Sequence, residues 1–143
     1  MTISLLRPFR TLLGALLLVG AIALPAAASA ASPEEVAGCQ ATISALNRDL
    51  TATDPLTGTF TNFTSLSVKD RTGLSGKLTE ASQKLSQGKY LDALDKLVDF
   101  RARVGQLQAA GKITTADATG LLTGVDTAIG CVNGLLAAST ISV

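Results

Sequence analysis

The sequence predicts an all-α protein, a small four-helix bundle that follows a signal peptide. No proline occurs in the 88 residues after Pro55, and Ala, Leu, Lys, Gln and Asp dominate that region, which favours helix over sheet. Apolar residues recur there at alternating spacings of three and four, as in amphipathic helices. Three of the four expected helix starts have Ser or Thr three residues before Glu or Asp, the pattern of an N-terminal capping box.

The first 30 residues have the layout of a cleavable secretory signal. Arg7 and Arg10 give a positive start, residues 11–24 are apolar and uncharged, and residues 28–30 (Ala-Ser-Ala) fit a peptidase site. The apolar stretch is shorter than the ~20 residues that a spanning helix needs. We therefore expect cleavage rather than an uncleaved anchor, and no stable membrane insertion afterwards. The protein should be secreted, either extracellular or associated with the cell wall.

The remaining chain, residues 31–143, is expected to form a single helical domain of 113 residues. Loss of Arg7 and Arg10 takes the 12 basic residues to 10, against 11 acidic ones, for a formal charge of −1. A near-neutral chain has no broad electrostatic reason to bind nucleic acid. We expect no nucleic-acid partner.

The first helix is expected to start at Pro33, because Ser32 can cap it and Glu35 can close the capping box. It should end near Thr53, and its stripe consists of Val36, Cys39, Ile43, Leu46 and Leu50. Residues 54–66 are rich in Thr, Gly and Asn and predict a loop. That long link lets the first helix cross an end of the bundle.

Phe60 and Phe63 are apolar rings within this polar loop. Either they tuck under the loop and cover the open end of the bundle, or one of them is an exposed contact residue. Both are kept as candidate contact residues.

The second helix is expected to start at Ser67 and to stop at Gly88, a left-handed C-cap. Gly73 and Gly76 weaken its first turns and leave a start nearer Ser75 open. Its stripe is Leu74, Leu78, Ala81 and Leu85.

The third helix should cover about residues 89–110 and stop at Gly111, and the fourth should follow the cap Thr114 with Asp117 as box partner. Residues 137–143 are expected to fray. The third stripe is Ala93, Leu97, Phe100, Val104 and Leu107, and the fourth is Ala118, Leu122, Val125, Ile129, Val132 and Leu136. Short links make the second, third and fourth helices antiparallel neighbours.

Cys39 and Cys131 are the two cysteines of the chain. Export would place them in an oxidising compartment, where paired thiols become disulfides. The alternatives are two free thiols or a metal pair, but the chain has no His, so a zinc site would lack ligands. We expect a disulfide and no metal site. The closed loop of about 93 residues would be worth roughly 4–5 kcal/mol.

Small residues surround both cysteines. The glycines nearby are Gly38 on the first helix and Gly120, Gly124, Gly130 and Gly134 on the fourth. A disulfide brings Cα atoms to about 5.5–6 Å, closer than ordinary helix axes. The glycines either permit this approach or only reflect a composition rich in Gly and Ala.

The chain carries no recognisable catalytic chemistry. Without His there is no imidazole base for a Ser or Cys nucleophile, so we expect no enzyme and no cofactor. Asp92, Asp95 and Asp99 form either a metal or acid–base cluster or a solvated face. Lys96 and Arg103 follow two of them at four residues, which favours the solvated face.

The segment from Leu78 to Leu122 carries a characteristic series of apolar, glycine and charged residues. The series consists of Leu78, Ala81, Leu85, Gly88, Lys89, Ala93, Leu97, Phe100, Val104, Gly111, Lys112, Ile113, Asp117, Ala118 and Leu121. Their order and spacing resemble the FIMAH module of secreted bacterial proteins over about residues 68–132. This resemblance implies a non-catalytic helical appendage of extracellular proteins, with no binding residues to transfer. The added first helix and the cysteine pair indicate a free-standing version.

These observations predict a secreted, non-catalytic interaction or structural module whose partner is an extracellular protein or a cell-wall component. Two alternatives remain. One is a carrier of a small apolar ligand between the helices, and the other is an inhibitor of a secreted enzyme.

Overall fold

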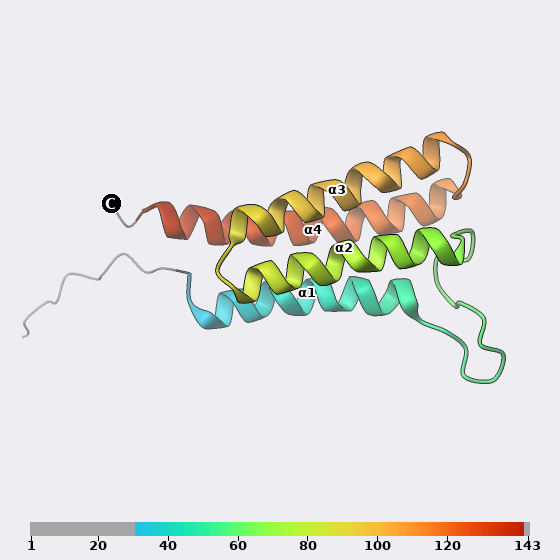
Figure 1. Cartoon of the computed structure of the whole chain (residues 1–143), viewed down its shortest axis with the longest axis horizontal. Coiled ribbons are helices and arrows are strands. Elements are labelled where there is room, and N and C mark those ends of the chain that lie inside the picture. Colours follow the sequence, from blue (N-terminus) through green and yellow to red (C-terminus); the bar gives the residue numbers. More distant parts are fainter. Residues whose placement is uncertain (1–30, 142–143) are drawn as a thin grey trace, which may run out of the picture.

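Four helices run up and down beside one another in the computed structural model, which describes residues 31–141 (Figure 1). They are α1 (Pro33–Thr51), α2 (Val68–Ser86), α3 (Tyr90–Ala109) and α4 (Thr115–Thr140). Each helix packs against two others, α1 and α3 both lying against α2 and α4. The predicted four-helix bundle is therefore confirmed. The predicted signal peptide, 1–30, lies outside the described residues.

α1 lies along the bundle instead of crossing its end (Figure 1). The expected crossing was wrong because the apolar stripe of α1 is buried along the helix, from Cys39 to Leu50. The long link between α1 and α2, residues 52–66, instead turns back at one end of the bundle. It is called the 52–66 loop below.

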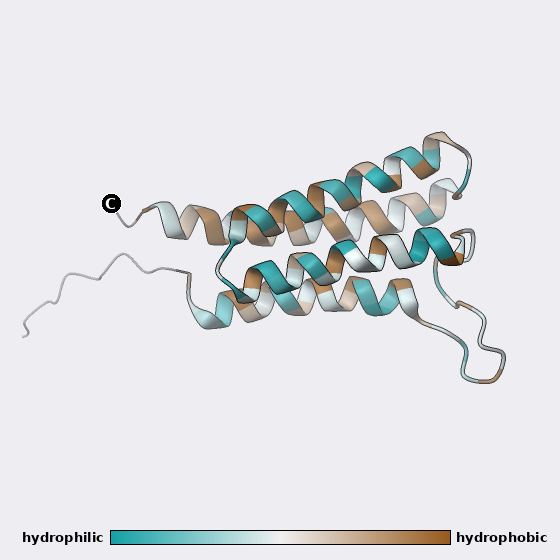
Figure 2. Ribbon diagram, viewed as in Figure 1, coloured by the Kyte–Doolittle hydropathy of each residue, from teal (hydrophilic) through white to brown (hydrophobic). Residues whose placement is uncertain are grey.

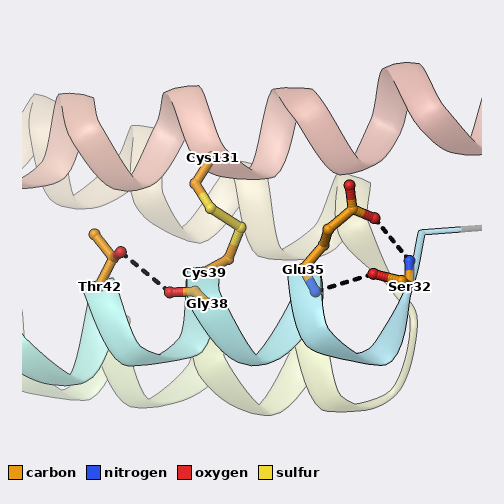
Figure 3. The surroundings of a disulfide bond; sticks show 6 residues. All are labelled: Ser32, Glu35, Gly38, Cys39, Thr42 and Cys131. Carbon is orange, nitrogen blue, oxygen red and sulfur yellow. Dashed lines mark hydrogen bonds between the residues drawn. A yellow bond between two sulfur atoms is a disulfide. The ribbon is translucent and has the colours of Figure 1, made fainter.

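The helix ends follow the local signals. Ser32 Oγ accepts from the Glu35 N–H at 3.2 Å, and a Glu35 carboxylate oxygen accepts from the Ser32 N–H at 2.8 Å, which completes the capping box (Figure 3). α2 begins at Val68, so its glycines do not delay the start to Ser75. Gly88 and Gly111 take positive φ values of 71° and 66° after α2 and α3, as helix-stopping glycines do.

The core is one continuous seam between the four helices, visible as apolar stripes along them (Figure 2). The predicted stripe of α4 is confirmed at Ala118, Val125 and Val132, which are fully buried, and was one residue off at its other three positions. Its fully buried side chains include Leu121, Ala128 and Leu135, whereas Leu122 and Ile129 are half-buried. Because α4 faces both α1 and α3, that direction buries Leu121, Ala128 and Leu135 in place of the predicted neighbours.

α4 extends to Thr140, into the segment 137–143 that was expected to fray, of which residues 142–143 lie outside the described part of the chain. Ser139 and Thr140 donate their hydroxyls to the carbonyls of Leu136 and Ala137, at 2.8 and 2.9 Å. Both hydroxyls therefore form hydrogen bonds with backbone carbonyls of the last helical turn.

Cys39 and Cys131 form the predicted disulfide between α1 and α4, with Cα atoms 5.6 Å apart (Figure 3). Cys39 is buried and Cys131 is half-buried. The covalent link spans a sequence separation of 92 residues and ties the first helix to the last.

The predicted role of the glycines in bringing α1 and α4 together is confirmed at Gly124 and wrong at Gly38, Gly130 and Gly134, whereas Gly120 faces the loop instead. A Cβ at Gly124 would lie 2.6 Å from Leu46 Cδ1, and one at Gly120 would lie 2.9 Å from Phe63 Cε1. These two residues let α4 approach α1 and the loop closely. A Cβ would meet nothing within 4 Å at the other three positions, Gly38, Gly130 and Gly134.

The charged side chains pair between helices rather than along them. Lys77 pairs with Asp99 at 3.2 Å, Glu80 with Lys96 at 2.8 Å, and Lys84 with Asp92 at 3.5 Å. The expected intrahelical pairing of Asp92 with Lys96 and of Asp99 with Arg103 was wrong, because α2 offers closer partners across the seam. These half-exposed pairs each contribute about 0–1 kcal/mol.

α4 is long and apolar enough to cross a membrane by length and composition. The core helix of a soluble protein meets the same criteria, and Leu121, Val125 and Val132 of α4 are fully buried within the bundle. Packing against α1 and α3 buries the apolar stripe of this helix.

Candidate functional site

The buried side chain of Arg71 anchors the 52–66 loop. Arg71 lies in the first turn of α2 and is 2% exposed. Its guanidinium donates to the carbonyls of Leu50, Asn62 and Phe63, the last two at 3.0 and 2.6 Å. It thereby joins the end of α1, the loop and α2 in one contact.

The sequence prediction missed Arg71, although a signal was present. Arg71 continues the stripe of Leu74 and Leu78 backwards by three residues, so the helix directs it into the bundle. A charge at a stripe position predicts a buried polar contact, because an unpaired buried charge is costly. Burial lowers the pKa of Arg71 and the charge of Asp117 opposes that change.

A second contact fixes the end of the loop to α4. Ser65 donates its N–H to a carboxylate oxygen of Asp117 at 3.0 Å, and its hydroxyl donates to the same oxygen. The Thr114 N–H donates to Ser65 Oγ at 3.1 Å. Thr114 does cap the helix through the Asp117 N–H, but the carboxylate binds the loop instead of closing the predicted box.

The outer half of the loop is an ordered turn. Asp54 accepts from the N–H groups of Leu56 and Thr57 at 2.7 and 3.1 Å, and Thr53 pairs with Phe60 in an antiparallel bridge. The bonds from Leu56 and then Thr57 lower the pKa of Asp54. The turn holds Leu56 at its tip with 93% of the side chain exposed.

Phe60 and Phe63 both lie half-buried against the bundle. The Phe60 ring lies under the Arg71 guanidinium, 3.8 Å from its carbon to the ring centroid. Phe63 takes a positive φ of 50° and packs against the core beside Gly120. These positions agree with rings that cover the open end of the bundle, and the exposed apolar side chain of the loop is Leu56.

A groove of about 570 Å³ lies between α1 and α2. Most of its lining is polar and uncharged: Gln40, Ser44, Asn47, Thr79, Ser82, Gln83 and Ser86, with Ile43 and Leu78 below. A polar lining of this kind suits hydrogen bonding more than the burial of an apolar ligand.

Comparison of the chain with protein-family models, with curated proteins and with solved structures finds no match in any of the three. The similarity to the FIMAH module therefore remains a resemblance carried by the residues named above.

Proposed function

We propose that the chain is a secreted, non-catalytic helical module that binds an extracellular protein or a cell-wall component through its 52–66 loop. The observation that carries this proposal is the exposed Leu56, held at the tip of a turn whose base is fixed by buried Arg71. A preorganised apolar anchor binds without the entropy loss of ordering a flexible loop.

Three further features support this function. The signal-like first 30 residues and the Cys39–Cys131 disulfide suit an oxidising compartment outside the cell. The chain has no His, which removes the commonest catalytic base. The FIMAH resemblance also implies a non-catalytic role in extracellular proteins.

The test is a capture experiment on the immobilised protein with cell-wall fractions and secreted proteins of its host. Leu56→Ser is the test variant, and Leu91→Ser is the matched control because Leu91 is 66% exposed at the start of α3, at the opposite end of the bundle. Burial of one leucine contributes about 1.5–3 kcal/mol, so Leu56→Ser should weaken capture roughly tenfold or more. Equal capture by all three proteins, or none by the wild type, would contradict the proposal.

A further inference from the structure

The loop end of the bundle carries a second surface feature, a groove of about 440 Å³. Its lining residues come from the start of α2, from α3 and from the link between α3 and α4. The start of α2 and that link lie at the end of the bundle from which the 52–66 loop projects (Figure 1). Its polar lining comes from Ser65, Ser67, Lys69, Asp70, Arg103 and Lys112. Elements distant in sequence thus bring three basic side chains to one hollow.

The groove is positively charged although the domain is not. Lys69, Arg103 and Lys112 against Asp70 give the lining a net charge of +2 (three minus one), whereas residues 31–143 carry 10 basic and 11 acidic residues, or −1. This excess is therefore local to the loop end of the bundle.

Asp70 forms its ion pair with Arg103 rather than with either lysine. One of its oxygens accepts from Ser67 Oγ at 2.7 Å and the other accepts from Arg103 Nη2, also at 2.7 Å. Lys69 and Lys112 belong to none of the ion pairs among residues 31–141. Arg103 also keeps further N–H donors, because a guanidinium has five.

We propose that this groove binds a phosphate group of the partner. A guanidinium fork beside two ammonium groups offers several charged donors to the oxygens of one anion. This inference rests on the proposed interaction function and adds the chemistry of the partner. The partner is an anionic component that carries phosphate. Its phosphate binds in the groove while Leu56 makes an apolar contact with it.

The experiment measures binding of inorganic pyrophosphate to the protein by calorimetry and by NMR titration at low ionic strength. Lys69→Gln combined with Lys112→Gln is the test variant. Lys89→Gln is the control, because Lys89 is exposed at the other end of the bundle and forms none of the ion pairs among the described residues. A circular dichroism melt confirms that each variant is folded.

Saturable binding by the wild type and by the control, with a loss of roughly tenfold or more in the double variant, is the expected result. Absence of saturable binding, or equal affinity of all three proteins, would overturn the proposal. A parallel arm with poly(glycerol phosphate) identifies the source of the phosphate. Retention of the polymer by the wild type and its release from the double variant support a wall polymer, whereas binding of pyrophosphate alone supports a small phosphate ligand.

Leu56→Ser separates this inference from the proposed function. The variant should bind pyrophosphate like the wild type, because Leu56 does not line the groove. Loss of partner capture with intact pyrophosphate binding supports both proposals. Capture that depends on Leu56 without any pyrophosphate binding overturns only the phosphate site.

Discussion

The guanidinium carbon of Arg71 lies 3.8 Å from the centroid of the Phe60 ring. The cation on α2 thus covers the ring of a loop residue and also donates to loop carbonyls. Through this one side chain, the loop that presents Leu56 is joined to α2 and to the end of α1.

Replacement of Arg71 should destabilise the protein. Arg71→Met keeps the buried stem but leaves the carbonyls of Asn62 and Phe63 without their donor, so we expect a loss of about 2–3 kcal/mol. Chemical denaturation measures it. Arg101→Met is the control, since Arg101 is exposed and its one ion pair within residues 31–141 is with Asp126. This variant should change stability by less than about 1 kcal/mol. Equal effects of the two variants would exclude a special role for Arg71.

The glycines of α4 should respond differently to alanine. The methyl group added by Gly130→Ala would have no other atom within 4 Å. This variant should therefore stabilise the helix by about 0.5–1 kcal/mol. Gly124→Ala places a methyl group against Leu46, so it should be less stable than Gly130→Ala by about 1–3 kcal/mol. Thermal unfolding of both variants checks this order, and a more stable Gly124→Ala would show that α1 and α4 are not closely packed there.

Removal of the disulfide should strongly reduce stability. Joint replacement of Cys39 and Cys131 by alanine frees the loop between them in the unfolded chain, at a loss of about 4–5 kcal/mol. Denaturant titration of the variant beside the oxidised wild type gives the value. A loss below about 1 kcal/mol would mean that the link does not constrain the unfolded state.

The turn at Asp54 should depend on pH. Backbone bonds from Leu56 and Thr57 lower the pKa of Asp54 from its ordinary 3.8, so the ionised form is favoured in the folded loop. This stabilisation is present above the ordinary value and is lost as the pH falls through the lower, folded value. An NMR titration of the Asp54 carboxyl carbon should give a midpoint below 3.8, and a midpoint at or above it would contradict the turn. Asp54→Asn is the control for the pH dependence of the turn. The asparagine keeps an oxygen acceptor for the two N–H groups but does not titrate.

The sequence predicts those parts of the fold that local chemistry decides. The starts at Ser32, Ser67 and Thr114 and the stops at Gly88 and Gly111 depend on neighbouring residues alone, and all five are confirmed. The disulfide followed from the expected export and from the absence of other partners for the two cysteines.

Features that depend on which helices are neighbours were not predictable in this way. The choice of Ala128 over Ile129 reflects the direction of α1 and α3 from α4. Glu80 and Lys96 pair because α2 and α3 are adjacent, and no spacing along one helix reveals that. In the loop, the sequence left open whether Phe60 covers the end of the bundle or is an exposed contact residue, and the structure places its ring against the buried Arg71.

Native-state amide hydrogen exchange across the 52–66 loop tests most directly whether Arg71 holds the loop in a fixed shape. The N–H groups of Asp54 and Thr61 donate to the carbonyls of Thr59 and Ala52 at 2.7 and 3.0 Å. They should exchange slowly in the wild type. In Arg71→Met they should exchange much faster, while the amides of α3 remain protected. Unprotected exchange of both loop amides in the wild type would contradict a preorganised loop.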